Sequence, residues 1–386
     1  MKIFASVFLI VFFAASCQSQ SNKAEAVKPV QIEKWRSEID KLFTAFTYTT
    51  PGYAIGIIKG ENILYSKGYG SANLDHNVPI SSQSAFDIAS VSKQFTAACI
   101  ALLIIEGKLK LEMPASNFIP QLKKYKDTIR IKHLVYNSSG IIDYHRLPRP
   151  DGRSWITFNY FTIDDCINVS LDQDTLAFHP GEKWDYCNVN FMLLARMVEK
   201  VSGQSFAEFA RKRLFDPLGM KNTLINDDIT KVIRNRVMPY NKRTKETVNA
   251  YRESGVDIKN EGEWVQHPRI SPHFGGSGII TTVDDLLLWS KNFYTKQFGG
   301  DPFYELMHRK EKFIHGRNNQ AFGLYWGKYK DKDYVAWDGG DWGISSQLIR
   351  FPDKGIAIVV LSNIGTGEAY RQANLIADIL IENGIL

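Results

Sequence analysis

The strand-forming segments of this chain lie near its two ends, and a long stretch from about residue 92 to residue 297 separates them. That stretch has helical or irregular patterning. The β-rich runs are Tyr53–Lys59, Ile63–Tyr69, Ala321–Lys328, Ser345–Phe351 and Ile356–Leu361. A small sheet at either end alone would leave unpaired strand edges, so we expect the two sets to pair with each other. The sequence therefore predicts an α+β fold with one antiparallel sheet and a large helical insertion.

Apolar residues at helical spacing predict helices before, within and after the insertion. They cover Glu33–Phe46, Lys93–Glu106, Asn190–Val201, Phe206–Leu214, Val283–Phe293 and Glu368–Ile381. We expect the first and the last of these helices, which are the two terminal ones, to flank the sheet. The predicted domain runs over residues 33–386, with the sheet from about 33–88 and 300–386 and the insertion from about 89–299.

Composition excludes two broad classes of protein. The chain is 44% hydrophobic and 23% charged, so it can bury enough apolar surface to fold and is not a disordered protein. Its net charge is only +6, and its Lys and Arg residues are scattered without a basic stripe. We therefore expect no nucleic-acid partner.

The first residues are typical of an export signal. Lys2 is followed by an apolar run from Ile3 to Phe13 and then by Ala14-Ala15-Ser16-Cys17. This arrangement resembles a bacterial lipoprotein signal, in which the cysteine is lipidated, although Ala14 stands where leucine is usual. The alternative is an ordinary signal cut near the same place. We predict a signal peptide over 1–17, a flexible tether over 18–32, and a cell-envelope or periplasmic protein anchored to the membrane only through lipid at Cys17.

The cysteines and histidines give no sign of a metal site or cofactor. Cys99, Cys166 and Cys187 contain no CxxC pair, and the eight histidines show no HxH, HExxH or HxxxH spacing. Cys99 lies in an apolar helix and is expected in the core. A Cys166–Cys187 disulfide stays open at this point.

The first chemical signal is Ser90-Val91-Ser92-Lys93 at the start of a helix that is apolar nearly all round. Such a helix is buried, so Ser90 would lie at its positive end and Lys93 on the same face, one turn on. A lysine in a dry site loses basicity and can accept the serine proton near pH 7. The alternative is that Ser90 caps a helix and Lys93 is a solvated neighbour.

Two further signals follow along the chain. Tyr186-Cys187-Asn188 lies before a helix. A phenol near a lysine ammonium can lose its proton more easily and relay it, while the amide of Asn188 can contact both Lys93 and substrate. The alternative is a structural tyrosine. Trp337-Asp338-Gly339-Gly340 precedes the strand Ser345–Phe351, where glycines indicate a close backbone approach or a plain turn.

Together the three signals resemble the serine β-lactamase and penicillin-binding-protein superfamily, in its class C-like branch. Further matches include Ser138-Ser139-Gly140-Ile141, Gly276-Ser277-Gly278-Ile279 and Arg350-Phe351-Pro352-Asp353-Lys354-Gly355. The resemblance implies a β-lactamase/transpeptidase-like fold and a serine hydrolase that forms an acyl-enzyme. It implies Ser90 as nucleophile, Lys93 as base, Tyr186 as proton shuttle, Asn188 as a substrate-orienting residue, and the N–H groups of Ser90 and Gly340 as the oxyanion hole.

One position departs from the pattern. The β-lactamases and carboxypeptidases of the superfamily place lysine or histidine where this chain has Trp337, whereas family VIII carboxylesterases carry Trp-Gly-Gly. Asp338 is not part of that variant. We count Trp337, Asp338 and Gly339 as substrate-binding and predict a carboxylesterase-type hydrolase that prefers neutral or weakly anionic esters. The alternative is that Trp337 points into the core and Arg350 supplies the cation.

Other functions stay open. One is a D-alanyl-D-alanine carboxypeptidase, D-amino-acid peptidase or β-lactamase. Another is a degraded envelope lipoprotein that only binds a ligand. An α/β-hydrolase is disfavoured because the chain has no G-x-S-x-G. The expected partner is therefore a small ester, amide or D-peptide.

Overall fold

The computed structural model describes residues 29–259, 261–365 and 368–386. The predicted signal peptide, Cys17 and residues 18–28 of the predicted tether lie outside the described residues. Helix α1 runs over Pro29–Leu42, so the prediction that residues 29–32 belong to the tether is wrong. Proline is favoured in the first helical turn because its missing N–H has no partner there in any case.

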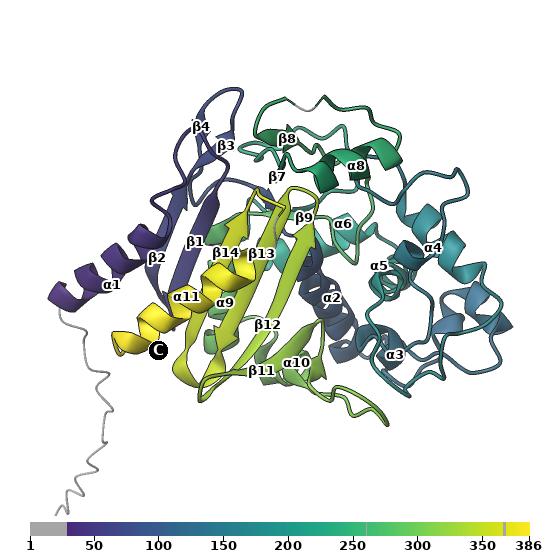
Figure 1. Cartoon of the computed structure of the whole chain (residues 1–386). Helices are drawn as coiled ribbons and strands as arrows, with labels where there is room; N and C mark the ends of the chain where they lie inside the picture. Colours follow the sequence, from purple (N-terminus) through teal and green to yellow (C-terminus); the bar gives the residue numbers. More distant parts are fainter. Residues whose placement is uncertain (1–28, 260, 366–367) are drawn as a thin grey trace, which may run out of the picture.

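A seven-stranded antiparallel sheet joins the two ends of the chain, as predicted (Figure 1). Its order is β10-β11-β12-β13-β14-β1-β2. The strands are β1 (Tyr53–Lys59), β2 (Asn62–Tyr69), β10 (Gln320–Ala321), β11 (Leu324–Tyr329), β12 (Lys332–Asp341), β13 (Ile344–Phe351) and β14 (Ile356–Ser362). The junction between the ends is the pairing of β1 with β14, from Tyr53 opposite Ser362 to Lys59 opposite Ile356.

Both faces of this sheet are covered. Helix α11 (Ala369–Glu382) packs on β13 and β14 and also contacts α1, so the two terminal helices share one face. Helix α9 (Val283–Thr295) packs on β1 and β14 from the other side, next to the helical half of the molecule (Figure 1). Every residue of β13 and β14 is consequently buried.

The insertion is mainly helical but also contains short strands. Its other helices are α2 (Lys93–Ile105), α3 (Ile131–Val135), α4 (Ile163–Leu171), α5 (Asn188–Ser202), α6 (Phe206–Ala210), α7 (Asp216–Leu218) and α8 (Lys245–Glu253), and α10 (Gly300–His308) follows it. The short strands within it are β6 (Leu224–Ile225), β7 (Tyr240–Lys242), β8 (Trp264–Gln266) and β9 (Ile279–Thr281). Three more short strands precede it: β3 (Ser71–Asn73), β4 (Val78–Pro79) and β5 (Phe86–Asp87). No helix among the described residues is long and apolar enough to cross a membrane.

Three sequence predictions need correction. The main sheet uses residues 53–69 and 320–362, because residues 71–87 turn away into minor sheets and α10 precedes β10. The strand expected at Ala321–Lys328 is split into β10 and β11 by a turn in which Gly323 has a φ of +61°. The helix expected at Phe206–Leu214 continues from α6 through a π-helical turn into α7.

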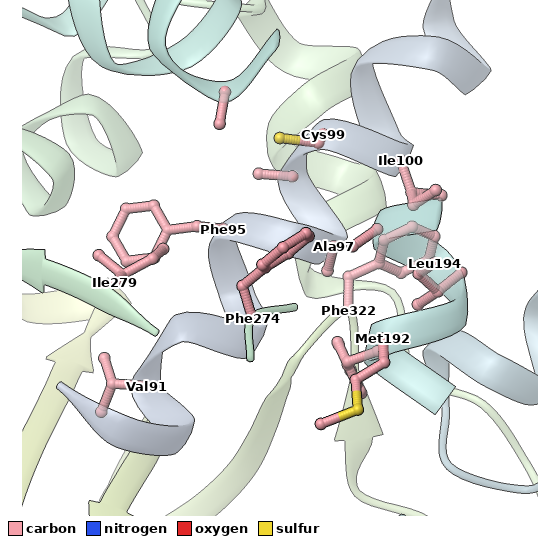
Figure 2. Packing of buried hydrophobic residues seen from close by; sticks show 14 of the residues in the cluster. Val91, Phe95, Ala97, Cys99, Ile100, Met192, Leu194, Phe274, Ile279 and Phe322 are labelled. Atoms are coloured by element: carbon pink, nitrogen blue, oxygen red, sulfur yellow. The ribbon is translucent and has the colours of Figure 1, made fainter. Parts of the chain in front are cut away.

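Helix α2 crosses the core of the helical half. Nearly all of its residues are buried, as its all-round apolar pattern predicts. Figure 2 shows Phe95, Ala97 and Ile100 of this helix among side chains from other elements, including Met192 of α5. Cys99 is part of this core, and Cys166 and Cys187 are buried free thiols, so the structure holds no disulfide between those two. The start of α2 is thereby fixed in position for the chemistry at Ser90.

Candidate active site

Ser90 lies in a 3-10 turn, Ala89–Ser92, which leads directly into α2. The sequence placed it in the first turn of the helix itself, and the difference arises at Ala89, whose φ is +44°. This left-handed conformation is unusual for a residue with a Cβ atom. The Asp87 carboxylate supports it by accepting a hydrogen bond from the Ala89 N–H at 2.9 Å.

Lys93 is fully buried beneath Ser90. Its Nζ donates to Ser90 Oγ at 3.1 Å, to Asn188 Oδ1 at 2.7 Å and to the Gly276 carbonyl at 2.6 Å. Burial disfavours the ammonium and lowers the pKa of Lys93 from its usual 10.5 to about 7, although nearby carboxylates, Asp143 above all, act in the opposite direction. A large share of Lys93 is therefore neutral near pH 7 and able to accept the Ser90 proton.

Tyr186 completes the group of hydrogen-bonded residues formed by Ser90, Lys93 and Asn188. Its hydroxyl lies 2.6 Å from Ser90 Oγ and donates to Asn188 Oδ1 at 3.1 Å, and Lys93 Nζ lies 4.7 Å from the centre of its ring. The expectation that this phenol loses its proton more easily is wrong, because burial raises the pKa of Tyr186. A neutral phenol suits the donation of a proton to a leaving group better than its removal from Ser90.

Asp143 is a buried residue that sequence analysis did not single out. Its carboxylate accepts hydrogen bonds from the backbone N–H of Asn188, where α5 begins, and from that of His145. It therefore caps α5 and fixes the segment that carries Tyr186. A lone aspartate in an irregular segment carries no signal of this contact, which joins residues 45 positions apart.

Strand β12 carries the Trp337–Gly340 motif, which sequence analysis placed before the strand Ser345–Phe351 without recognising a strand of its own. A Cβ atom at Gly339 would lie 2.4 Å from the Ile88 carbonyl and 3.0 Å from the Ser90 nitrogen, so glycine alone permits this close approach. Pairing with β11 ends at Ala336, whereas pairing with β13 continues to Asp341. The backbone around Gly340 therefore lies beside Ser90, paired with β13 on one side and unpaired with β11 on the other.

Two connected hollows meet at Ser90, Tyr186 and Gly340, which line both of them. The larger has a volume of about 1020 Å³ and is bordered by charged and polar groups that include Arg149, Arg153, Glu246, Glu253 and Asp341. The smaller, of about 320 Å³, is lined by Trp184, Arg317, Gln320, Tyr325, Trp337 and Asp338. We call them the large and the small compartment. A substrate bound at Ser90 can extend into both.

Trp337 lies at the border of the small compartment. It is only 6% exposed, and its ring stacks on Tyr186 at 6.3 Å between centroids. Arg350 is only 1% exposed, its guanidinium lies 3.8 Å from the centre of the Phe293 ring, and it borders neither compartment. The cation that does border the small compartment is Arg317, whose guanidinium lies 5.4 Å from the centre of the Trp184 ring. No sequence pattern singles this residue out.

Comparison with known proteins assigns the family. The sequence matches the family model described as Beta-lactamase over residues 39–382. The chain belongs to the β-lactamase family. Its match to this family covers both the sheet and the helical half, in agreement with the fold and with the motifs at Ser90, Tyr186 and Trp337.

The relatives of this chain have names that indicate different activities. The chain is 28% identical to penicillin-binding protein 4* of Bacillus subtilis, over 82% of this chain and 69% of that protein. It is 24% identical to a D-aminopeptidase of Gluconobacter oxydans, over 85% of this chain but only 58% of the relative.

Solved structures agree on the β-lactamase/transpeptidase-like fold. A penicillin-binding protein homologue from Pyrococcus abyssi superposes with a TM-score of 0.74 at 24% identity, covering 91% of this chain and 77% of that one. A D-amino acid amidase from Ochrobactrum anthropi gives a TM-score of 0.73 at 18% identity, with coverages of 92% and 99%. At these identities the likeness concerns the fold.

Proposed function

We propose that this protein is a serine hydrolase that cleaves neutral carboxylic esters through an acyl-enzyme on Ser90. The observation that carries the proposal is the unbroken set of hydrogen bonds from Lys93 through Ser90 to Tyr186. A degraded site that only binds a ligand would have no need of a buried lysine with a depressed pKa.

In this mechanism neutral Lys93 takes the Ser90 proton as Oγ attacks the substrate carbonyl. The N–H groups of Ser90 and Gly340 hold the resulting oxyanion. Tyr186 gives its proton to the leaving oxygen and recovers one from the Lys93 ammonium. Water then attacks the acyl-enzyme, its proton passes to Lys93, and the released Ser90 oxygen is reprotonated, which restores the starting state.

The preference for neutral substrates is inferred from the small compartment. Penicillins and D-alanyl-D-alanine peptides carry a carboxylate near the bond that is cleaved. Trp337 presents an apolar ring and no cation, and the Asp338 carboxylate borders the same space. The cation of this compartment, Arg317, is stacked over Trp184 and does not lie on β12. A charge-assisted hydrogen bond contributes about 1.5–3 kcal/mol, so its absence on β12 disfavours such anions.

Replacement of Trp337 tests this preference. We expect wild-type kcat/KM to be higher for a short-chain nitrophenyl ester than for a chromogenic cephalosporin. Trp337→Lys should raise kcat/KM for the cephalosporin by roughly ten- to a hundredfold, because it adds the cation that β12 lacks. Asp338→Asn is the matched control, which removes repulsion without adding a cation and should give a smaller gain.

Two results would contradict the preference. One is a wild-type advantage for the cephalosporin. If Arg317→Gln removed that advantage, Arg317 would be the carboxylate-binding cation. The other is a Trp337→Lys variant, folded and labelled at Ser90, that gains nothing on the cephalosporin.

A second candidate is hydrolysis of D-amino acid amides or peptides. Its support is the similarity to the D-aminopeptidase of Gluconobacter oxydans. A D-amino acid nitroanilide assayed beside the nitrophenyl ester, with the L-enantiomer as control, separates the two candidates.

We also infer export and lipid attachment at Cys17, from the apolar run and small residues that precede it. The expected result is that the full-length protein, expressed in a bacterium fed an alkyne-tagged fatty acid, carries the tag and sediments with membranes. Cys17→Ser should lose both properties, and a tag retained by that variant would contradict the assignment.

A further inference from the structure

We propose that Arg269 and Asp87 act together as positioning residues for acylation, because they hold the turn that carries Ser90 and the loop that holds Lys93 in one fixed arrangement. This inference rests on the proposed function of Ser90. It concerns a buried network that lies behind the reacting atoms and was not apparent from the sequence.

The network begins with an ion pair between two buried side chains. Arg269 Nη1 lies 2.6 Å from Asp87 Oδ2, and the side chains are 1% and 5% exposed. Burying two charges is costly, and a pair of this kind is weak evidence for a gain in stability. Its geometry is informative, because the other oxygen of Asp87 accepts the hydrogen bond from the Ala89 N–H.

That hydrogen bond acts on a strained residue. Ala89 has a φ of +44°, a conformation that is unfavourable for a residue with a Cβ atom and persists only if its surroundings impose it. Asp87, held by Arg269, is the group that contacts its N–H. Relaxation of Ala89 to a right-handed conformation would reorient the next residue, Ser90, and with it one donor of the oxyanion hole.

The other end of the guanidinium reaches the Lys93 side of the site. Arg269 Nη2 donates to the His273 carbonyl at 2.8 Å and to Ser277 Oγ at 3.2 Å. Gly276, between these residues, supplies the carbonyl that accepts from Lys93 Nζ. One planar group thus links the turn that carries Ser90 to the loop whose Gly276 carbonyl accepts from Lys93. Lysine could not reproduce this link, because it lacks the fork of donors.

The test compares Arg269→Met with Thr223→Val. Thr223 is buried, donates to Asp285 at 2.7 Å and lies outside the active site, so its variant loses a buried polar contact without touching Ser90 or Lys93. The measurements are the rate of Ser90 labelling by a fluorophosphonate, kcat and KM for a nitrophenyl ester, and Tm. We expect Arg269→Met to slow labelling and kcat by about a hundredfold with little change in KM, since small displacements of reacting groups have effects of this size.

Two more variants separate the charge of Arg269 from its hydrogen bonds and test whether it acts together with Asp87. Arg269→Lys keeps the charge opposite Asp87 but loses the bonds to the loop, so we expect an intermediate labelling rate. Asp87→Asn combined with Arg269→Met should lose no more activity than Arg269→Met alone, because the two residues act as a unit. If Arg269→Met does not fold, Arg269→Lys and Asp87→Asn decide the question by the same measurements.

The inference is overturned if folded Arg269 variants label at the wild-type rate. It is also overturned if Thr223→Val, at an equal loss of Tm, slows labelling as much. A wild-type protein that is not labelled at Ser90 would instead refute the proposed function, and the inference with it, so the two failures are distinguishable.

Discussion

Ser90→Ala is expected to abolish acyl-enzyme formation and to lower ester turnover by roughly 10⁴-fold or more, because Ser90 Oγ is the hydroxyl that Lys93 and Tyr186 contact. The fold should persist. The hydroxyl contributes hydrogen bonds to Lys93 and Tyr186, and loss of one such bond costs about 1 kcal/mol. Intact-mass spectrometry after treatment with a fluorophosphonate should show one adduct on the wild type and none on Ser90→Ala.

Ser92→Ala is the matched control for this variant. Ser92 is the second serine of the same motif, but its Oγ accepts a hydrogen bond from the Ile279 N–H at 3.2 Å, whereas Lys93 Nζ bonds to Ser90, Asn188 and Gly276. We expect it to keep the adduct. Wild-type ester hydrolysis by Ser90→Ala, or an adduct that disappears only in Ser92→Ala, would refute the assigned nucleophile.

Lys93→Met should lower kcat/KM by orders of magnitude, because methionine fills a similar volume but cannot accept the Ser90 proton.

The pH profile of wild-type activity gives an independent measure of the role of Lys93. Since burial lowers the pKa of Lys93 to about 7, the neutral base predominates above that pH. Activity should therefore fall about tenfold for each pH unit well below 7 and level off above it.

The sign of this profile discriminates between two roles of Lys93. If the residue worked as a cation, activity would fall rather than rise through pH 7. Burial raises the pKa of Tyr186, so this phenol adds no ionisation in the neutral range. A profile with a descending limb near 7 would contradict the role of Lys93 as base.

Local patterns predict those features of the molecule that depend on segments near each other in sequence. The apolar surface around Phe95–Leu103 requires a buried helix, and burial of that helix places Lys93 in a dry site. Runs of β-forming residues bounded by turn residues define β1, β2, β13 and β14 within one residue at each end. The need to cover strand edges then joins the ends of the chain into one sheet.

Tertiary structure alone decides which distant groups meet. Strand β12 escapes local analysis because its Asp and Gly residues are poor strand formers, and it exists because β13 and β11 pair with it on either side. The contacts of Asp143 with Asn188, of Gly276 with Lys93 and of Arg269 with Asp87 join residues between 45 and 183 positions apart. The pKa of Lys93 follows from burial and from charges such as Asp143 that the fold brings near it. The sequence thus determines the reacting residue types, whereas their distances and protonation states arise only when the sheet and the helical half close around them.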